Sequence, residues 1–507
     1  MQNNPLGVSL AEYANGPADG GAYSGFANTS PEQLAELSKA LEAGQITGRE
    51  TTNLSSVGAQ GLKVESLEKN LKLITFKESD IVLWKRIPKS PAYNTVEEYN
   101  QLTSYGAERG GSLVEGELPD EQDSTYVRRA QLVKFYGVTK SVTHAMTLVN
   151  TNVGPLIQRE ITNGTLWILR KINRALTAGN EKMIPTEING LYAQHRANDV
   201  FSTEEQYLAS DIVVDMRGLP LSEAAVENAA NGIVENFGYG NLLMAPPKVL
   251  TDFVKSFYGN KFVGLPGGNI DSTVGHRVSK FASQYGDIEL VYDKFMNPAP
   301  ARGTTDGATH ASKAPNAVGA LTITTPADST AKFGTAAVTY YVAVAATNRF
   351  GESVLTAATL VTVAIGQAIN IAFADGGGTY PASCYTIYRS TPNPTDTIAN
   401  TALYPIFQVS VADKNSGYDG STAAGQVRDK NKWLPATMNA FLIEDDEEVY
   451  AFKQLAPLMK MDLALLGPAH RFMVLLYGVL QLYAPKKMVR FVNIGKANGA
   501  SSLNTIV

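Results

Sequence analysis

Apolar residues recur at helical spacing in several segments of the chain. The longest such segment is GPLIQREITNGTLWILRKINRALTAGN, in which Pro155 begins a helix and Gly179 ends it. Its apolar positions are Ile157, Ile161, Ile168, Ile172 and Leu176. The pattern predicts a rigid helix of about 25 residues, roughly 37 Å long. Gly164, in its middle, permits a bend or close packing.

Two further helices are predicted after residue 219, in a compact α+β domain. Ser222 is suited to cap the first helix, and Leu221 and Val226 can form a hydrophobic staple. The buried stripe of the first helix is predicted to be Val226, Ile233, Val234 and Phe237. The second helix follows the apolar run NLLMA and begins at Pro246 and Pro247. Its inward positions are predicted to be Val249, Phe253 and Phe257.

Residues 312–430 have a different character. Ala, Thr and Val become frequent, helical patterns vanish, and short strands recur between turn signals. The strand-like runs are VGALTIT, AVTYYVAVAAT, SVLTAATLVTV, AINIAFA, CYTIYRST and YPIFQVSV. In the second run, alternate residues from Val338 to Val344 fall on one face, as in a half-buried strand. We expect a two-sheet sandwich inserted into the α+β domain, with its two ends close together.

A long two-stranded arm is predicted between residues 92 and 144. Two extended runs flank a glycine-rich tip, and the tip and the returning strand carry opposite charges. The acidic residues of the tip are Glu115, Glu117, Asp120, Glu121 and Asp123, and the basic residues of the returning strand are Arg128, Arg129 and Lys134. Because an isolated hairpin is marginally stable in water, such an arm is suited to docking on another copy of the molecule. The alternative is that the charges form solvated faces.

The N-terminal part predicts less regular structure. Residues 1–61 are rich in Gly, Asn, Ser and Ala, with one short helix that Ser30 caps and Gly44 ends. This segment is expected to be an extended arm, either ordered across a neighbour or a flexible tail. Residues 62–91 begin with a helical period, which Pro88 and Pro91 break.

Composition narrows the class of protein. The chain has 507 residues, of which 44% are hydrophobic and 18% charged, so we expect a folded multidomain protein. The net charge of −5 argues against a protein whose whole surface binds nucleic acid, although local basic patches are compatible with it. The only cysteine, Cys384, permits no intrachain disulfide and is expected to be a small buried hydrophobe.

The sequence predicts neither secretion nor a membrane span. Its N-terminus lacks a basic region followed by an apolar one. The longest apolar run, residues 472–484, is shorter than the roughly 20 residues that cross a bilayer, and we expect it to be a buried strand.

Motifs of enzyme chemistry are missing from the sequence. It contains no Walker A pattern, no zinc-protease helix motif, no paired Cys-x-x-Cys and no nucleophile elbow. FGYGNLL resembles the start of a dinucleotide fingerprint but lacks the third glycine. The five histidines have no spacing typical of metal ligands. We therefore predict no catalytic, cofactor or metal site.

The order of these elements resembles the major capsid protein of tailed bacteriophages, which has the Hong Kong 97-type fold. The likeness is greatest to capsid proteins of large contractile-tailed phages. It is carried by DIVLWKRIPKSPAYNTVEEY before the hairpin and, most specifically, by LLYGVLQLYAPKKMVRFVNI at residues 475–494. The resemblance covers about residues 62–494, whereas the first sixty residues match no family.

The resemblance implies an α+β structural protein made of named parts. These are an N-terminal arm (1–61), a helical lead-in (62–91), an E-loop hairpin (92–144), a peripheral domain with a spine helix (145–218), an axial domain (219–311 and 431–507, the latter shared with the peripheral domain) and an inserted Ig-like or fibronectin-like sandwich (312–430). In the family, hexamers and pentamers form an icosahedral shell around double-stranded DNA. The subunit's partners are then other copies of itself and, in addition, portal, scaffolding and decoration proteins. No membrane is involved, and the location is the virion, assembled in the bacterial cytoplasm.

Two hypotheses concern the contacts between subunits. The five acidic residues of the arm tip are predicted to meet basic residues of an adjacent subunit, while Arg128 and Arg129 hold the returning strand against its neighbour. The inserted sandwich is predicted to be dispensable for closure of the shell. Two other classes stay open: a surface adhesin or glycan-binding protein built around the sandwich, and an enzyme with an accessory sandwich.

Overall fold

The computed structural model describes residues 75–106, 111–119, 121–149, 155–197, 212–257, 278–296, 299–334, 337–395, 401–418, 423–464 and 467–496. The helix predicted near residues 30–44 and the helical start of the lead-in lie outside these ranges. Among the described residues, no helix combines the length and apolar character needed to cross a membrane. Helices and strands occur throughout, so the predicted α+β class is confirmed.

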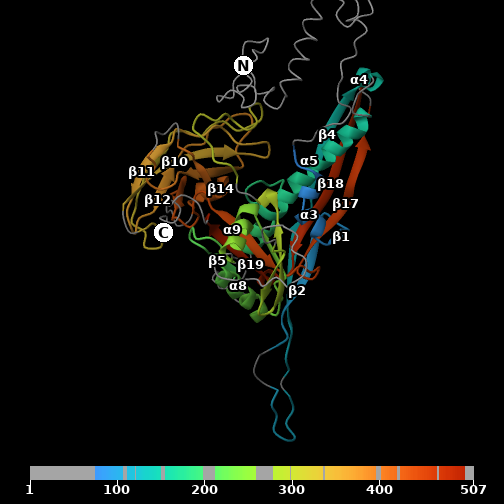
Figure 1. Ribbon diagram of the computed structural model, residues 1–507, viewed down its shortest axis with the longest axis vertical. Coiled ribbons are helices and arrows are strands. Elements are labelled where there is room, and N and C mark those ends of the chain that lie inside the picture. Colours follow the sequence, from blue (N-terminus) through green and yellow to red (C-terminus); the bar gives the residue numbers. More distant parts are fainter. Residues whose placement is uncertain are drawn as a thin grey trace, which may run out of the picture. The chain divides into compact units, whose positions relative to one another are not determined.

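A long helix packs against a four-stranded sheet. Helix α5 (Leu156–Ala178) has Gly179 as its C-cap, as predicted. It lies along the sheet β1-β17-β18-β4 (Figure 1). The strands are β1 (Lys89–Pro91), β4 (Lys134–Thr143), β17 (Tyr450–Asp462) and β18 (Ala469–Leu482). The apolar run predicted to be a buried strand forms most of β18, where Phe472, Leu476 and Leu480 are buried in the core shared with α5.

Close contact between α5 and this sheet depends on Gly164. This glycine is buried inside the helix, and a Cβ at its position would lie 3.3 Å from Val474 Cγ2 and 3.4 Å from Val138 Cγ1. The close packing predicted for Gly164 is therefore observed. Ile168 and Ile172, on the same side of the helix, are completely buried.

A six-stranded sheet forms a second layer, with the order β5-β19-β16-β6-β8-β7. Its strands are β5 (Val213–Asp215), β6 (Leu242–Ala245), β7 (Lys280–Ser283), β8 (Gly286–Tyr292), β16 (Met438–Ile443) and β19 (Met488–Ile494). One face joins the α5 core, and the other packs on helices α8 (Glu223–Glu235) and α9 (Pro247–Phe257). Because both faces are covered, Leu242 and Leu243 are buried on opposite sides of the sheet.

The ends of α8 confirm the predicted cap and correct the predicted stripe. Ser222 Oγ accepts a hydrogen bond from the Ala225 N–H at 3.2 Å, and Leu221 and Val226 are buried. Phe237, predicted to be buried, is instead 91% exposed. The helix ends at Glu235, and Phe237 adopts a left-handed backbone conformation with φ of 62°, beyond the last helical turn.

The stripe predicted for α9 is confirmed at Val249 and Phe253, both of which are buried. The side chain of Phe257 lies outside the described part of the chain.

Residues between β8 and β16 form two further sheets. Their orders are β11-β10-β13-β14 and β15-β12-β9. The strands are β9 (Thr322–Thr324), β10 (Val338–Thr347), β11 (Thr359–Val363), β12 (Ile369–Ala372), β13 (Cys384–Arg389), β14 (Tyr404–Ser410) and β15 (Gln426–Asp429). Apolar residues from both sheets share one core, including Tyr340, Val342 and Val344 on the predicted face of β10. We refer to residues 322–429 as the sandwich, and its Ig-like classification stays a prediction.

A buried arginine joins the two sheets of the sandwich to the chain that leaves it. Arg389 on β13 is completely buried and forms an ion pair with Asp429 on β15. It also donates hydrogen bonds to the Asn431 side chain and to the Trp433 carbonyl. The backbone N–H of Lys332 donates to the Lys430 carbonyl at 2.8 Å.

The remaining helices are short. They are η2 (Glu78–Asp80), α3 (Leu83–Arg86), α4 (His144–Leu148), α6 (Leu191–Ala197), η3 (Lys294–Met296), α10 (Val411–Ser416) and η4 (Pro485–Lys487). A buried polar chain fixes α3 against α5: the Asn173 side chain accepts from the Trp84 N–H at 2.9 Å and donates to Asp293 at 2.6 Å.

Candidate assembly surfaces

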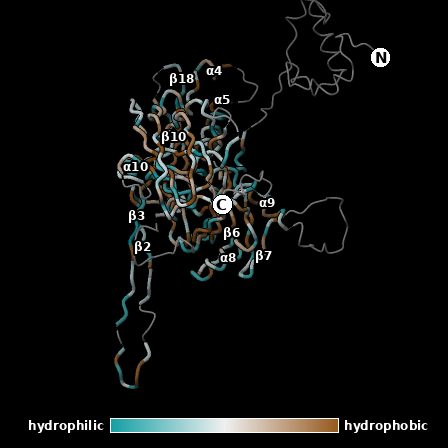
Figure 2. The backbone as a smooth tube through the Cα atoms, turned by 90° about the vertical axis from the view of Figure 1, so that its left-hand side faces the viewer, coloured by the Kyte–Doolittle hydropathy of each residue, from teal (hydrophilic) through white to brown (hydrophobic). Residues whose placement is uncertain are grey.

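A two-stranded ribbon extends away from the sheets (Figures 1 and 2). Strand β2 (Val96–Ser104) pairs antiparallel with β3 (Thr125–Leu132), with an irregular register between Leu102 and Ser104. We call residues 96–132 the arm. The described arm residues are exposed or half-buried on both faces, so the packing of this chain does not account for the length of the arm. Beyond Val133, which is buried, the chain continues as β4 in the sheet beside α5.

The base of the arm is fixed to the end of β18. The rings of Tyr99 and Tyr483 meet edge to face, with centroids 4.9 Å apart, and the Tyr99 hydroxyl donates to the Leu482 carbonyl at 3.1 Å. Gln481 Nε2 donates to the Glu97 carbonyl at 3.3 Å. These contacts give the ribbon a defined origin while its tip stays uncovered.

The two predicted basic residues link the strands of their own arm. Arg128 on β3 forms an ion pair with Glu98 on β2, and Arg129 donates to the Gln101 side chain. Arg128 is exposed and Arg129 is half-buried. Both pairs hold the ribbon together within one chain, so the contact with a neighbour that the sequence suggested for these arginines stays a prediction. Lys134 lies beyond the ribbon and pairs with Glu181 at 2.6 Å.

The acidic residues of the tip project from a turn. Glu115, Glu117, Glu121 and Asp123 are all exposed, and Asp120 lies outside the described residues. The Glu117 carboxylate accepts a hydrogen bond from the Val114 N–H at 3.1 Å, so it also shapes the turn.

Apolar residues accompany these carboxylates, which the charge-based prediction did not include. Leu113, Val114 and Leu118 are 48%, 75% and 88% exposed. The sequence stretch SLVEGELPDE could have indicated this exposure. Its apolar residues alternate with acidic ones in a short turn, which is too small to bury them. A surface that is both apolar and acidic is suited to a partner that is both apolar and basic.

Helix α5 carries a surface of that kind. One side of the helix displays residues at helical spacing, which are Arg159, Asn163, Trp167, Arg170 and Arg174. We call this set the α5 stripe. Trp167 is 39% exposed, and the only acidic residue of α5, Glu160, pairs with Lys140 at 3.0 Å. Three arginines make the stripe cationic, although the Glu187 carboxylate is close enough to Arg174 for the two charges to attract, and Arg170 packs over the Phe76 ring, 5.4 Å from its centroid.

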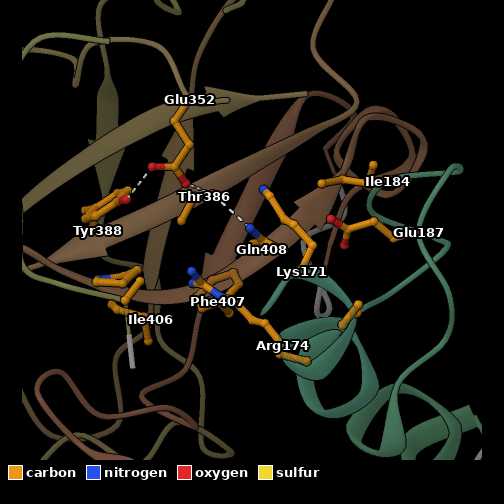
Figure 3. A pocket seen from close by; sticks show the side chains of 15 residues that line it. Lys171, Arg174, Ile184, Glu187, Glu352, Thr386, Tyr388, Ile406, Phe407 and Gln408 are labelled. Atoms are coloured by element: carbon orange, nitrogen blue, oxygen red, sulfur yellow. Dashed lines mark hydrogen bonds between the residues drawn. The ribbon is translucent and has the colours of Figure 1, made fainter. Parts of the chain in front are cut away.

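A cleft of about 340 Å³ separates the end of α5 from the sandwich (Figure 3). Lys171 and Glu187 lie on one side of it, and burial lowers the pKa of Lys171 and raises that of Glu187. On the other side, the Glu352 carboxylate accepts hydrogen bonds from the Tyr388 hydroxyl at 2.8 Å and from Arg302 at 3.1 Å. Both of these bonds end on Oε2, and the Thr386 hydroxyl donates to Oε1 at 3.2 Å, so both oxygens of Glu352 are held by hydrogen bonds within the chain.

Cysteine and histidine chemistry adds no site among the described residues. Cys384 is completely buried, as predicted, and burial raises the pKa of its thiol to about 12. His195 is also completely buried, with Nε2 3.0 Å from the Met488 carbonyl oxygen. Within the described ranges, no group of three or more His, Cys, Asp or Glu side chains could hold a metal ion.

Solved structures of a capsid and of an encapsulin are similar to the chain at low identity. The capsid of a native GTA particle is 8% identical, covering 86% of this chain and 96% of that one, with a TM-score of 0.42. The holo-SrpI encapsulin complex of Synechococcus elongatus PCC 7942 is 8% identical, covering 87% and 96%, with a TM-score of 0.39.

Known proteins match over most of the sequence. The major capsid proteins of Staphylococcus phages S25-3 and K are each 24% identical over 469 residues, covering 88% of this chain and 93% of theirs. The putative major capsid protein of Enterococcus phage phiEF24C is 23% identical over 471 residues, covering 91% and 96%.

The family described as SU10 major capsid protein matches residues 45–353 of the chain, which is more than half of its length. This match agrees with the resemblance seen in the sequence and gives no support to the adhesin alternative. The chain therefore belongs to the SU10 major capsid protein family, and its function is that of a major capsid protein in a phage virion.

Proposed function

We propose that the chain assembles, through hexamers and pentamers, into the icosahedral head shell of a tailed phage, which encloses double-stranded DNA. In this proposal the arm is the E-loop, α5 is the spine helix, and the six-stranded sheet with α8 and α9 is the axial domain. The sandwich is placed on the outer surface. Portal, scaffolding and decoration proteins are the additional partners, and assembly takes place in the cytoplasm of the host bacterium.

The observation that carries the proposal is the arm itself. The ribbon is fixed at its base by Tyr99 and Tyr483. The apolar residues at its tip are exposed, so their packing within the same chain contributes no stability. The ribbon gains stability when a second copy covers it, because apolar area is then removed from water.

The α5 stripe of a second copy is the surface that we propose for the arm tip. Trp167 offers an amphipathic ring to Leu113 and Leu118, while Arg170 and Arg174 face the carboxylates of Glu115 and Glu121. Arginine is suited to this role because its planar guanidinium can bind a carboxylate with two hydrogen bonds.

A charge-swap experiment tests this pairing. The variant Glu115→Lys with Glu121→Lys is expected to lose shells and rings in negative-stain electron microscopy, and so is Arg170→Glu with Arg174→Glu. Combining all four substitutions is expected to restore assembly, since the charges are exchanged rather than removed. The tip residue Glu117 is left unchanged because it shapes the turn.

The matched control is Glu447→Lys with Glu448→Lys, which changes the net charge equally at an exposed loop. It is expected to assemble as the unmodified chain does. Normal, equally salt-resistant shells from the tip variant would contradict the role of the acidic tip. If each double variant fails to assemble and the variant with all four substitutions also fails, the arm tip contacts a surface of the neighbouring subunit other than the α5 stripe.

A further inference from the structure

The two sheets of the sandwich have four edge strands between them, and β11 is one of these. In the sheet β11-β10-β13-β14, strand β11 pairs with β10 on one side only (Figure 1). An edge strand presents backbone N–H and C=O groups that another strand can bind. Natural proteins usually protect such edges with charged side chains, proline, bulges or a covering segment.

Three of the four edges show such protection. Strand β14 contains Pro405 and an irregular register with β13. Strand β15 contains Arg428, and Tyr418 pairs along its outer side, donating to the Gln426 carbonyl at 3.2 Å. Strand β9 is only three residues long and is soon followed by Pro326.

The β11 edge shows none of these features. From residue 353 to residue 367 the sequence SVLTAATLVTVAIGQ contains no charged residue and no proline. Its outward side chains are apolar or small: Leu360 is 55% exposed, Ile365 is 62% exposed and Thr362 is exposed. Val361 and Val363 point into the core of the sandwich and fix the strand in place.

The features of this edge favour a second copy of the same strand. Two identical edges that carried charge would repel one another, whereas this edge has no charge. In an antiparallel pair about a two-fold axis at Val361, Thr359 would lie opposite Val363 of the other copy, and Leu360 would lie opposite Thr362. Residues that face the core of one sandwich would then pair with residues that face the core of the other, and exposed residues with exposed residues. Assembly into a shell also supplies a high local concentration of copies.

We infer that the β11 edges of two subunits pair antiparallel, which joins two four-stranded sheets into one continuous sheet between neighbouring sandwiches. The inference rests on the proposed shell, because the shell brings the sandwiches together. It identifies the occupant of the edge as a second copy of this chain rather than a strand from another phage protein.

Cross-linking of shells assembled from the purified chain tests the pairing. Cys384 is completely buried, so Leu360→Cys introduces a single accessible thiol on β11. A short bismaleimide is expected to convert most of the Leu360→Cys chain to covalent dimers. The control, Thr322→Cys, places a thiol at an exposed position of the protected edge β9 and is expected to remain monomeric on denaturing gels. Equal dimer formation by the two variants would overturn the inference.

Amide hydrogen exchange of the unmodified chain gives a second, independent measurement. Exchange at residues 359–363 is expected to be about tenfold or more slower in shells than in dissociated subunits. Protection that appears only in complete virions, and not in shells of the purified chain, would assign the edge to another protein and overturn the inference. Absence of shells would reject the proposed assembly, whereas shells without protection or dimers at β11 would reject only the edge pairing.

Discussion

His195 couples the stability of this subunit to pH. Its ring is completely buried, and burial lowers its pKa to about 4 from an ordinary value of 6.5. As the pH falls, the unfolded chain therefore binds a proton at this histidine at a higher pH than the folded chain does. The contribution of neutral His195 to the free energy of unfolding is fully present above about pH 6.5 and is lost as the pH falls toward 4. The loss over this window is expected to be about 3 kcal/mol in the free energy of unfolding.

The variant His195→Gln tests the assignment. Glutamine retains an N–H for the Met488 carbonyl but does not titrate, so urea unfolding of this variant is expected to depend less on pH between 6.5 and 4. His310→Gln, at an exposed histidine, is the control and is expected to keep the original slope. An unchanged slope in the His195 variant would assign the acid sensitivity to other groups.

Gly478 is a second residue whose role is visible only in three dimensions. A Cβ there would lie 2.6 Å from Phe452 Cζ and 2.7 Å from the Lys453 carbonyl oxygen, between strands β17 and β18. Gly478→Ala is expected to lower the free energy of unfolding by about 1–3 kcal/mol, because both the ring and the backbone must move. Gly307→Ala, where no atom lies within 4 Å, should change it by less than about 0.5 kcal/mol in the same chemical denaturation.

At the scale of elements, the sandwich depends on the buried pair formed by Arg389 and Asp429, whose side chains are 0% and 3% exposed. Asp429→Asn leaves the arginine charge buried without its carboxylate, and a loss of about 3–5 kcal/mol is expected. The comparison variant Lys280→Gln removes an exposed ion pair with Asp287 and should cost less than about 1 kcal/mol. Thermal unfolding followed by circular dichroism distinguishes them, and equal melting temperatures would contradict the role of the buried pair.

The same scale shows which features local sequence patterns could predict. The cap at Ser222, the helix ending at Gly179 and the inward face of β10 follow from spacing and residue type, which are local properties. Phe237 was predicted to be buried because the helical spacing was extended to residue 237. The helix ends before that residue, and Phe237 itself adopts a left-handed conformation that leaves its side chain exposed. The charged residues of the arm were identified from the sequence. Leu113 and Leu118 were not, because their exposure to solvent depends on the turn at the tip, which the sequence pattern does not specify.

At the scale of the whole molecule, the cores are separate. The core around α5 and the core under α8 and α9 contain no residue between 312 and 430, while the apolar core of the sandwich lies entirely within that range. Strands β8 and β16, which flank the sandwich in sequence, both belong to the six-stranded sheet. The change in composition predicted a sandwich in this range, and its assignment as an inserted Ig-like domain stays a prediction. Local patterns could not predict the contacts between the sandwich and the rest of the chain, such as that between Arg217 and the Lys332 carbonyl at 2.8 Å.

The separation of cores predicts the effect of removing the sandwich. Replacement of residues 312–430 by a short flexible linker is expected to leave the six-stranded sheet and α5 folded, since neither core loses a member. Shells should still be visible by electron microscopy, because the arm and the α5 stripe remain. Their resistance to denaturant should fall below that of complete shells, because the β11 pairs are lost. A deletion variant that is soluble and folded by circular dichroism but forms aberrant particles would show that the sandwich helps to set the geometry of closure.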